Sequence, residues 1–403
     1  MIVPVELNGS KLKFILDSGV SNPILFNLTL EDSIQINQVS QISLKGLGEG
    51  EPIEALKSTQ NTFKIGNAVS NNQMLYVVLD KDLNFSTSLG IPVHGIIGYD
   101  VFKDFIVEVN YSRQYLKLHN PKYYSYEALN RKSETLPLTF VGKKAFIDGS
   151  VTTEDDLEVP VKLLVDTGSS DALWLFHDVE KGLKVPQKNY EDFLGEGLNG
   201  SIFGKRTKLK GMRIGSFRFN EAKVAFPYKT SFRAIKDLGN RNGSVGGEVL
   251  KRFNIVFDYR NNKISLVKNS KFKDPFQYNL AGIELQHNGL RYISESIVDS
   301  RNVVKSGQNK SGFGNVQILF QDRTRLSLVP EIVVSGIRAG SPAAQAGLKE
   351  GDVILAVNGK RIHDYKLQEI LQMLNEREGK RVKVLIERYD RDILYSFVLK
   401  NLF

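Results

Sequence analysis

Two aspartates, Asp17 and Asp166, each end an apolar, strand-like run and are followed by a hydroxyl residue and a glycine. Two carboxylates about 3 Å apart cannot both ionise readily, so such a pair shares one proton. The ionised carboxylate can then take a proton from a water while the protonated one donates to a carbonyl oxygen. If the fold brings the two motifs together, they predict acid–base attack of water on a carbonyl group.

The residues that follow each aspartate suit this arrangement. The Ser or Thr hydroxyl can hydrogen-bond nearby backbone and hold its loop. The glycine has no Cβ, which lets two such loops approach closely. One copy alone is usually an ordinary turn, because Asp and Gly are favoured there, so the prediction depends on a duplication. The two motifs are Asp17-Ser18-Gly19 and Asp166-Thr167-Gly168.

The chain is internally duplicated. Landmarks of the first half recur in the second half, in the same order and at offsets of 147 to 149 residues, which is very unlikely by chance. The sequence therefore predicts two equivalent lobes, each with one aspartate. The paired landmarks are Asp17 with Asp166, 47–50 with 194–197, 65–66 with 214–215, and 95–98 with 243–246.

Each half has the pattern of short β-strands separated by turns. Residues 3–7 and 12–16 are rich in strand-forming residues and flank Asn8-Gly9, a typical hairpin turn. Such a half fits a small closed β barrel. Further strands are expected at 74–79, 105–109, 115–118, 224–226, 255–258 and 263–267, and single helical turns at 99–103 and 248–252.

This pattern resembles the retropepsin-like and pepsin-like aspartic peptidases over roughly residues 1–270. The resemblance implies a mainly β fold with two pseudo-twofold-related lobes, which we place at 1–125 and 126–270. It implies that Asp17 and Asp166 form the catalytic dyad, completed by the Ser, Thr and Gly residues of the two motifs, with no metal or cofactor. In these families an apolar-apolar-Gly element crosses behind each catalytic turn. Residues 96–98 and 244–246 take that place, although Ser244 departs from the apolar pattern.

The same families close glycine-rich hairpin flaps over the substrate, and residues 46–50 and 195–200 are the candidates. A pepsin-type flap carries a Tyr that neither stretch has, which favours a retropepsin-like pair of flaps. Plain hairpin turns are the alternative, although long glycine-bearing loops often carry function. The substrate-binding residues expected here are Gly48, Glu49, Gly50, Gly195, Glu196 and Gly197.

Residues 276–403 have a different character. The run 339–360 resembles the core of a PDZ domain of the bacterial protease type. Within this run, Ser341-Pro342 suits a helix start and Gly347 a helix end. Residues 367–374 repeat apolar side chains at helical spacing, which predicts a helix with one buried face.

A PDZ domain takes an extended peptide as an added strand, and a loop of backbone N–H groups receives the terminal carboxylate of that peptide. The alternative is a structural strand that opens the domain without binding peptide. The polar stretch 300–314 predicts an exposed, mobile loop. The residues that resemble the carboxylate loop are Leu280, Ala281, Gly282 and Ile283.

Composition argues against several other classes of site. The 403 residues include no Cys, so there is no disulfide, thiol nucleophile or Cys-based zinc site. The five His lack metal-ligand spacing, and there is no Gly-x-Ser-x-Gly elbow or phosphate loop. The net charge of +9 is spread along the chain, which favours a basic surface over a nucleic-acid site. No apolar stretch is long enough to span a membrane.

Trp174, the only Trp, is expected to pack behind the second catalytic turn, with a substrate subsite as the alternative.

Together these features predict an aspartic endopeptidase whose PDZ domain binds a substrate or partner peptide. The alternative is a non-catalytic peptide-binding scaffold that acts through its PDZ domain. The architecture resembles Bacteroidetes-type aspartyl proteases, which implies a periplasmic, cell-envelope or extracellular location; the residues leave a cytoplasmic location open.

In the second half, strand-like sequence begins 30 residues before Asp166 (166 − 136), yet only 16 residues precede Asp17. We therefore expect a leading strand, with or without a targeting segment, upstream.

Overall fold

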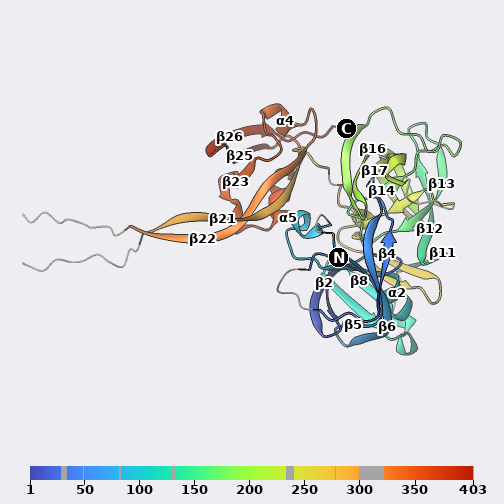
Figure 1. The fold of residues 1–403 in the computed structure, drawn as a ribbon. Coiled ribbons are helices and arrows are strands. Elements are labelled where there is room, and N and C mark those ends of the chain that lie inside the picture. The colour runs from blue at the N-terminus through green and yellow to red at the C-terminus, as the bar shows by residue number, and fades with distance from the viewer. Residues whose placement is uncertain are drawn as a thin grey trace, which may run out of the picture. The chain divides into compact units, whose positions relative to one another are not determined.

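The computed structural model describes residues 1–28, 34–48, 50–80, 83–128, 132–232, 240–276, 278–298 and 322–402. Glu49 and the loop predicted at 300–314 lie outside these residues. The chain divides into two compact units: unit 1 contains residues 1–86, 91–278 and 401–403, and unit 2 contains residues 87–90 and 279–400. Strands dominate both units, as predicted, while the boundaries of the individual domains stay predictions (Figure 1).

The first lobe is a closed β barrel. Its opening hairpin turns at Asn8 and Gly9, whose φ angles of 48° and 94° suit this two-residue turn. The sheet runs β1-β2-β7-β3-β6-β5-β4, and β1 also pairs with β5, which closes the ring. The strands are β1 (Ile2–Leu7), β2 (Ser10–Leu16), β3 (Ile24–Leu25), β4 (Val39–Leu44), β5 (Ile53–Ile65), β6 (Ala68–Val78) and β7 (Gly95–Ile97).

The second lobe repeats this topology. Its sheet runs β11-β12-β13-β18-β14-β17-β16-β15, and β12 also pairs with β16. From β12 onward, each strand corresponds in order to one of the first lobe, so the predicted duplication is confirmed. The strands are β11 (Thr139–Val141), β12 (Lys144–Thr152), β13 (Glu158–Val165), β14 (Leu173–Leu175), β15 (Tyr190–Gly197), β16 (Gly200–Ile214), β17 (Phe217–Pro227) and β18 (Gly243–Val245).

Another sheet joins the two lobes, in the order β10-β20-β19-β8-β9. At its centre β8 and β19, one from each half, lie antiparallel with Val109 opposite Ile255. Its strands are β8 (Ile106–Asn110), β9 (Tyr115–His119), β10 (Glu134–Pro137), β19 (Phe253–Asp258) and β20 (Lys263–Lys268). Helix α1 (Phe85–Leu89) has residues in both units. The other helices of unit 1 are α2 (Tyr99–Asp104), η1 (Pro121–Tyr123), η2 (Tyr126–Ala128), η3 (Lys229–Phe232) and α3 (Gly247–Leu250).

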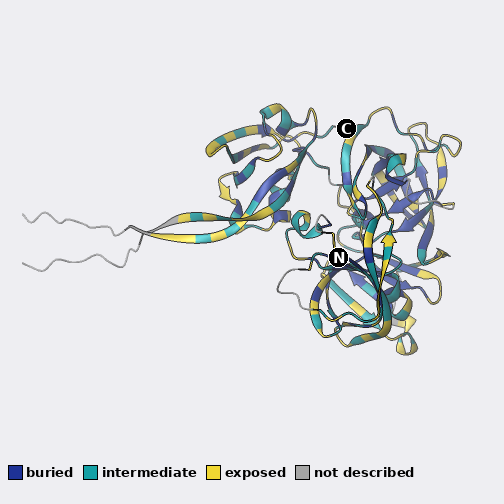
Figure 2. Ribbon diagram, in the orientation of Figure 1, coloured by how far each residue is buried: buried dark blue, intermediate teal, exposed yellow. Residues whose placement is uncertain are grey.

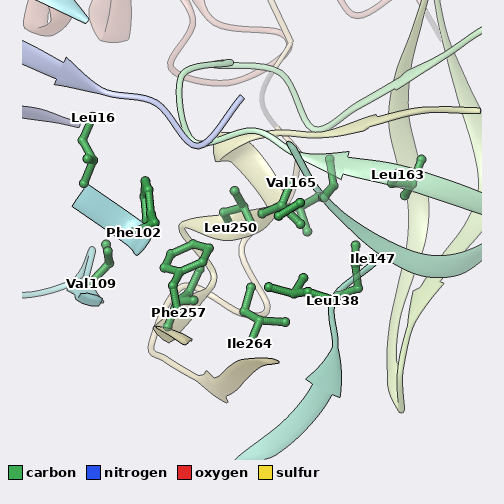
Figure 3. Packing of buried hydrophobic residues seen from close by; sticks show 14 of the residues in the cluster. Leu16, Phe102, Val109, Leu138, Ile147, Leu163, Val165, Leu250, Phe257 and Ile264 are labelled. Atoms are coloured by element: carbon green, nitrogen blue, oxygen red, sulfur yellow. The ribbon is translucent and has the colours of Figure 1, made fainter. Parts of the chain in front are cut away.

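One hydrophobic core runs through both lobes and the shared sheet (Figures 2 and 3). Phe102 of α2 meets Phe257 of β19 edge to face, with ring centroids 5.0 Å apart. Leu16 and Val165, which directly precede the two aspartates, are each 1% exposed and belong to this core. Full burial of one such side chain contributes roughly 1.5–3 kcal/mol. The core therefore fixes the two strands that carry the catalytic motifs.

Unit 2 contains an antiparallel β sheet and the α-helices α4 and α5. Its sheet runs β21-β22-β23-β25-β26, with β24 beside β23. As predicted, Ser341 caps α4 by accepting the Ala344 N–H at 3.2 Å, and Gly347 ends that helix with φ 101°. The elements are β21 (Ile283–Val298), β22 (Asp322–Ile337), α4 (Pro342–Ala346), β23 (Val353–Val357), β24 (Lys360–Arg361), η4 (Ile362–Asp364), α5 (Leu367–Leu374), β25 (Arg381–Arg388) and β26 (Arg391–Val398).

Candidate active site

Each aspartate follows a strand at the interior of its barrel sheet. The Asp17 N–H donates to Ile97 O at 2.8 Å, and the Asp166 N–H donates to Val245 O at 3.0 Å. These partners come from β7 and β18, which lie parallel to β2 and β13. The two catalytic motifs therefore occupy equivalent positions in the two lobes.

The apolar-apolar-Gly elements cross behind the turns, as the resemblance implies. A Cβ at Gly98 would lie 2.1 Å from Asp17 O, and one at Gly246 would lie 2.4 Å from Asp171 O. Only glycine fits so close to the backbone. Ser244, which departs from the apolar pattern, is 2% exposed and pairs in register with Trp174.

The turns that follow Asp17 and Asp166 are hydrogen-bonded to each other. The Ser18 N–H donates to Thr167 Oγ1 at 3.0 Å, and the Thr167 N–H donates to Ser18 Oγ at 3.1 Å. The Ser18 hydroxyl also donates to Val165 O at 2.6 Å, and the Thr167 hydroxyl donates to Leu16 O at 2.9 Å. Both hydroxyl side chains are buried. This reciprocal arrangement holds the two turns in one defined position.

The two carboxyl groups share the small space that the glycines leave. A Cβ at Gly168 would lie 2.4 Å from Asp17 Cγ, and one at Gly19 would lie 3.4 Å from Asp166 Cγ. The Gly19 N–H donates to Asp17 Oδ1 at 2.7 Å, and the Gly168 N–H donates to Asp166 Oδ1 at 3.1 Å. A second donor to Asp166 Oδ1 is the Ser169 N–H, at 2.9 Å. Any side chain at position 168 would displace the Asp17 carboxyl group.

The surroundings of Asp17 favour its protonated form. Burial raises the pKa of the Asp17 carboxyl, and the negative charge of Asp166 raises it further. The hydrogen bond from the Gly19 N–H opposes this rise. A side-chain hydrogen bond with Asp166 also raises the pKa of Asp17. The electrostatics therefore favour a pair of carboxyl groups that carries one proton.

Two cations that sequence reasoning missed lie within electrostatic range of the carboxyl pair. Burial lowers the pKa of Lys144, the charge of Arg241 lowers it further, and the charge of Asp166 opposes both. Burial also lowers the pKa of Arg241 to about 10. The Arg241 Nε donates to Gly243 O at 2.9 Å, and its guanidinium lies 5.2 Å from the Phe176 ring centroid. Neither cation belongs to a repeated landmark, so the sequence carried no signal for them.

The hairpins β4–β5 and β15–β16 meet at their tips around Asn199, which is 3% exposed. Its N–H donates to Leu47 O at 2.8 Å, and its C=O accepts the Gly50 N–H at 2.7 Å. Its carboxamide oxygen accepts the Gly46 N–H, and its nitrogen donates to Glu51 O. Sequence reasoning missed Asn199, because a single Asn in a hairpin turn looks like any turn residue.

The flap residues predicted from the sequence divide into two groups. Gly48, Gly50 and Gly197 lie where the tips meet: a Cβ at Gly48 would be 2.3 Å from Asn199 C, and one at Gly197 would be 2.2 Å from Leu47 O. Gly195 and Glu196 come just before Gly197 in β15 and are not part of this contact. Glu196 is exposed and accepts a hydrogen bond from Ser201, and a Cβ at Gly195 would meet nothing within 4 Å.

A buried charge network connects the turn after Asp166 to the β15–β16 hairpin. Arg206 of β16 donates to Asp171, five residues after Asp166, at 2.5 Å and to Asp192 of β15 at 2.8 Å. Trp174 Nε1 donates to the other Asp171 oxygen at 2.7 Å. Burial opposes ionisation of Asp171, yet the charge of Arg206 holds its pKa below the ordinary value. Trp174 also packs with Leu194 and Ile202 of that hairpin.

The predicted PDZ loop lies at the start of β21. Leu280, Ala281 and Ile283 are buried, at 8%, 0% and 1% exposure. Gly282 has φ 76°, and a Cβ there would lie 2.2 Å from the Ser341 side chain, so this position requires glycine.

Within the described ranges, no group of His, Cys, Asp and Glu could hold a metal ion. None of the described helices has the length and apolar character that a membrane span needs.

Comparison with known families gives two matches. An aspartyl protease family model matches residues 3–101 and 149–246, and a PDZ domain model matches residues 333–388. The first match covers the corresponding parts of both lobes, including both catalytic motifs.

Two curated proteins are similar to the chain in the PDZ region alone. A putative protease Do-like 14 of Arabidopsis thaliana is 34% identical over 74 residues, which is 18% of this chain and 14% of that protein. A probable periplasmic serine endoprotease DegP-like of Chlamydia trachomatis serovar D is 37% identical over 70 residues, which is 17% of this chain and 13% of that protein. The chain thus spans about one seventh of the length of these relatives.

Proposed function

Because the chain contains an aspartyl protease domain and a C-terminal PDZ domain, we propose that it is an aspartic endopeptidase in which Asp17 and Asp166 activate a water. The observation that carries this proposal is the reciprocal hydrogen bonding of Ser18 and Thr167. It holds two carboxyl groups around one small space, where a pair with a single proton can act as acid and base at once.

The proposed reaction needs only these two carboxyl groups and water. The ionised carboxylate takes a proton from water as the water oxygen bonds to the scissile carbonyl carbon. The protonated carboxyl donates its proton to the carbonyl oxygen, which gives a neutral tetrahedral diol. The first group then protonates the amide nitrogen, the second takes a proton back from the diol, and the C–N bond breaks. The pair ends with the single proton with which it began.

We assign substrate enclosure to the paired flaps. Residues 48–50 and 195–197 would cover an extended peptide lying across both lobes, and the contact around Asn199 would hold the flaps closed. A closed flap pair excludes water other than the attacking one. This assignment is supported by the close fit of the Gly48 and Gly197 backbones at the tips.

The PDZ domain would bind a peptide of the substrate or of a partner protein. Its likeness to a protein named as a periplasmic DegP-like protease supports a periplasmic or cell-envelope location. A peptide or protein is the only partner that this proposal requires.

The test is cleavage of a diverse peptide library from about pH 3 to pH 8 by wild type, Asp17→Asn and Asp166→Asn. We expect both variants to keep the fold, by circular dichroism, and to lose cleavage at every site. Asp148→Asn, an exposed carboxylate on β12, is the matched control and should cleave as wild type does. Cleavage that survives in Asp166→Asn would contradict the proposal. A folded wild type that cuts nothing would favour the scaffold alternative.

A further inference from the structure

The loop that opens the PDZ domain is already hydrogen-bonded by side chains of the same domain. The Leu280 N–H donates to Asn375 Oδ1 at 2.6 Å, and the Ala281 N–H approaches the same oxygen at 3.4 Å. The Gly282 N–H donates to Asn279 Oδ1 at 2.8 Å. Backbone N–H groups in such a loop are the donors that a terminal carboxylate uses. Here carboxamide oxygens of the chain itself take them.

Asn375 is held in this position by the end of α5. Its Nδ2 donates to Leu371 O at 2.9 Å, and its backbone N–H donates to Gln372 O at 3.2 Å. Because the amide nitrogen is bound to a helix carbonyl, the amide oxygen faces the loop. The Asn375 side chain is thus hydrogen-bonded to the last turn of α5 and to the loop at the same time.

Asn279 lies four residues before the start of β21. Its Nδ2 donates to Ile283 O at 3.0 Å. Ile283 is opposite Ile337 in β22, and the Arg338 N–H donates to Gly282 O. In an antiparallel ladder, hydrogen-bonded and non-hydrogen-bonded pairs alternate. Because Gly282 is hydrogen-bonded to Arg338, the next pair is not, and the N–H and C=O of Ile283 point away from β22. Asn279 is therefore hydrogen-bonded to the Ile283 C=O, the first carbonyl of β21 that an added strand would use.

We propose that Asn375 and Asn279 occupy the loop N–H groups that would otherwise bind a terminal carboxylate. The PDZ domain therefore binds an internal extended segment of a polypeptide along the outer edge of β21. A free C-terminus would bring its carboxylate against the Asn375 oxygen and would find the loop donors taken. An internal segment has no carboxylate and needs only backbone groups beyond Ile283. In the described part of the sheet, β21 pairs only with β22, so its other edge has no strand partner there.

The inference rests on the peptide-binding role proposed for the PDZ domain, and it is independent of the proposed peptidase chemistry. The test uses the full chain with Asp166→Asn, so that bound peptides are not cut. Peptides selected on an array are made in three forms: with a free C-terminal carboxylate, with a C-terminal carboxamide, and with the same sequence inside a longer chain. Fluorescence anisotropy measures Kd, and hydrogen exchange of residues 280–294 shows whether binding occurs at β21.

We expect the three forms to bind with Kd values that agree within about twofold. Asn375→Ala frees two loop N–H groups, so it should tighten binding of the free-carboxylate form by about tenfold and leave the carboxamide form unchanged, because hydrogen bonds to a charged group are the stronger ones. Asn375→Asp keeps an oxygen at the loop and adds a negative charge, so it should weaken the free-carboxylate form. Gln372→Ala, exposed on the same helix, is the control.

Two outcomes would overturn the inference. If wild type binds the free-carboxylate form at least tenfold more tightly than the carboxamide form, the loop N–H groups are available to a terminal carboxylate. No binding and no protection of β21 by any form would overturn the inference together with the peptide-binding role, while the cleavage assay would still decide the peptidase proposal separately.

Discussion

The Ser18 and Thr167 hydroxyls each accept the backbone N–H of the other residue, at 3.1 and 3.0 Å, although 149 positions separate them. Each hydroxyl then donates to a carbonyl of the opposite strand. These four bonds lie next to the two carboxyl groups and are buried. Because every donor and acceptor in the set is paired, the loss of one hydroxyl leaves several buried groups without partners.

Thr167→Val should therefore lower stability and activity together. Valine has nearly the shape of threonine, but it leaves the Ser18 N–H and Leu16 O unpaired, at a cost of about 1–3 kcal/mol for each buried group. We expect a lower Tm and a loss of at least about tenfold in kcat/KM. Thr167→Ser keeps the hydroxyl and should restore most of both, whereas Thr139→Val, on an exposed strand position, should change neither. Normal kcat/KM in Thr167→Val would show that the hydroxyl does not position the dyad.

Asp17 should make the protein less stable as the pH rises. Its raised pKa means that the folded state holds this proton more tightly than the unfolded chain does. The stabilisation is complete below the unfolded pKa, about 4, and is lost as the pH rises through the folded value. Asp17→Asn cannot ionise, so it should gain stability over wild type with increasing pH.

Urea denaturation at about pH 4 and pH 8 tests this difference. The free energy of unfolding of Asp17→Asn minus that of wild type should be larger at pH 8 than at pH 4, because only the wild type loses stability as Asp17 ionises. Asp148→Asn, whose carboxylate is exposed, is the control and should show no such change. A pH-independent difference for Asp17→Asn would contradict the assigned burial. The same rise in pKa places the alkaline limb of the activity profile above the ordinary range of an Asp.

Asn199→Ala should loosen the flaps without unfolding the lobes. The variant loses the side-chain bonds to Gly46 and Glu51 but keeps the backbone bonds to Leu47 and Gly50. We expect a several-fold rise in KM, with little change in Tm, and faster hydrogen exchange at residues 46–50. Asn220→Ala, exposed on β17, is the control. Unchanged exchange at the tips would show that the side chain does not hold the flaps together.

Arg206→Met should be strongly destabilising. The substitution keeps a long side chain but leaves Asp192 buried without its cation, and leaves Asp171 with only Lys223 at 3.6 Å, at a cost of about 3–5 kcal/mol. Thermal melting should show a large fall in Tm, and a second substitution, Asp171→Asn, should recover part of it. Arg213→Met removes an exposed ion pair and should leave Tm unchanged. Equal Tm values for the two Arg variants would contradict the assigned network.

Local patterns explain why much of the fold could be predicted. The alternation of apolar residues, the Asn8-Gly9 turn and the Ser341 cap each depend on residues close in the chain. The duplication supplied the pairing of Asp17 with Asp166. The contacts of Trp174 with Leu194 and Ile202 were not predicted, because these neighbours come from the β15–β16 hairpin and no local pattern indicates that contact.

The sequence by itself determined the strand pattern, the two repeated motifs and the residue types that acid–base chemistry needs, because these depend on neighbours and on repetition. Only the tertiary structure decided which distant groups meet. Asn199 and Asn375 are single residues in turns or helix ends, and their partners lie far away in sequence. A hydrogen bond depends on distance and direction in space, so the roles of these asparagines became visible only when the fold brought particular backbone N–H and C=O groups within reach.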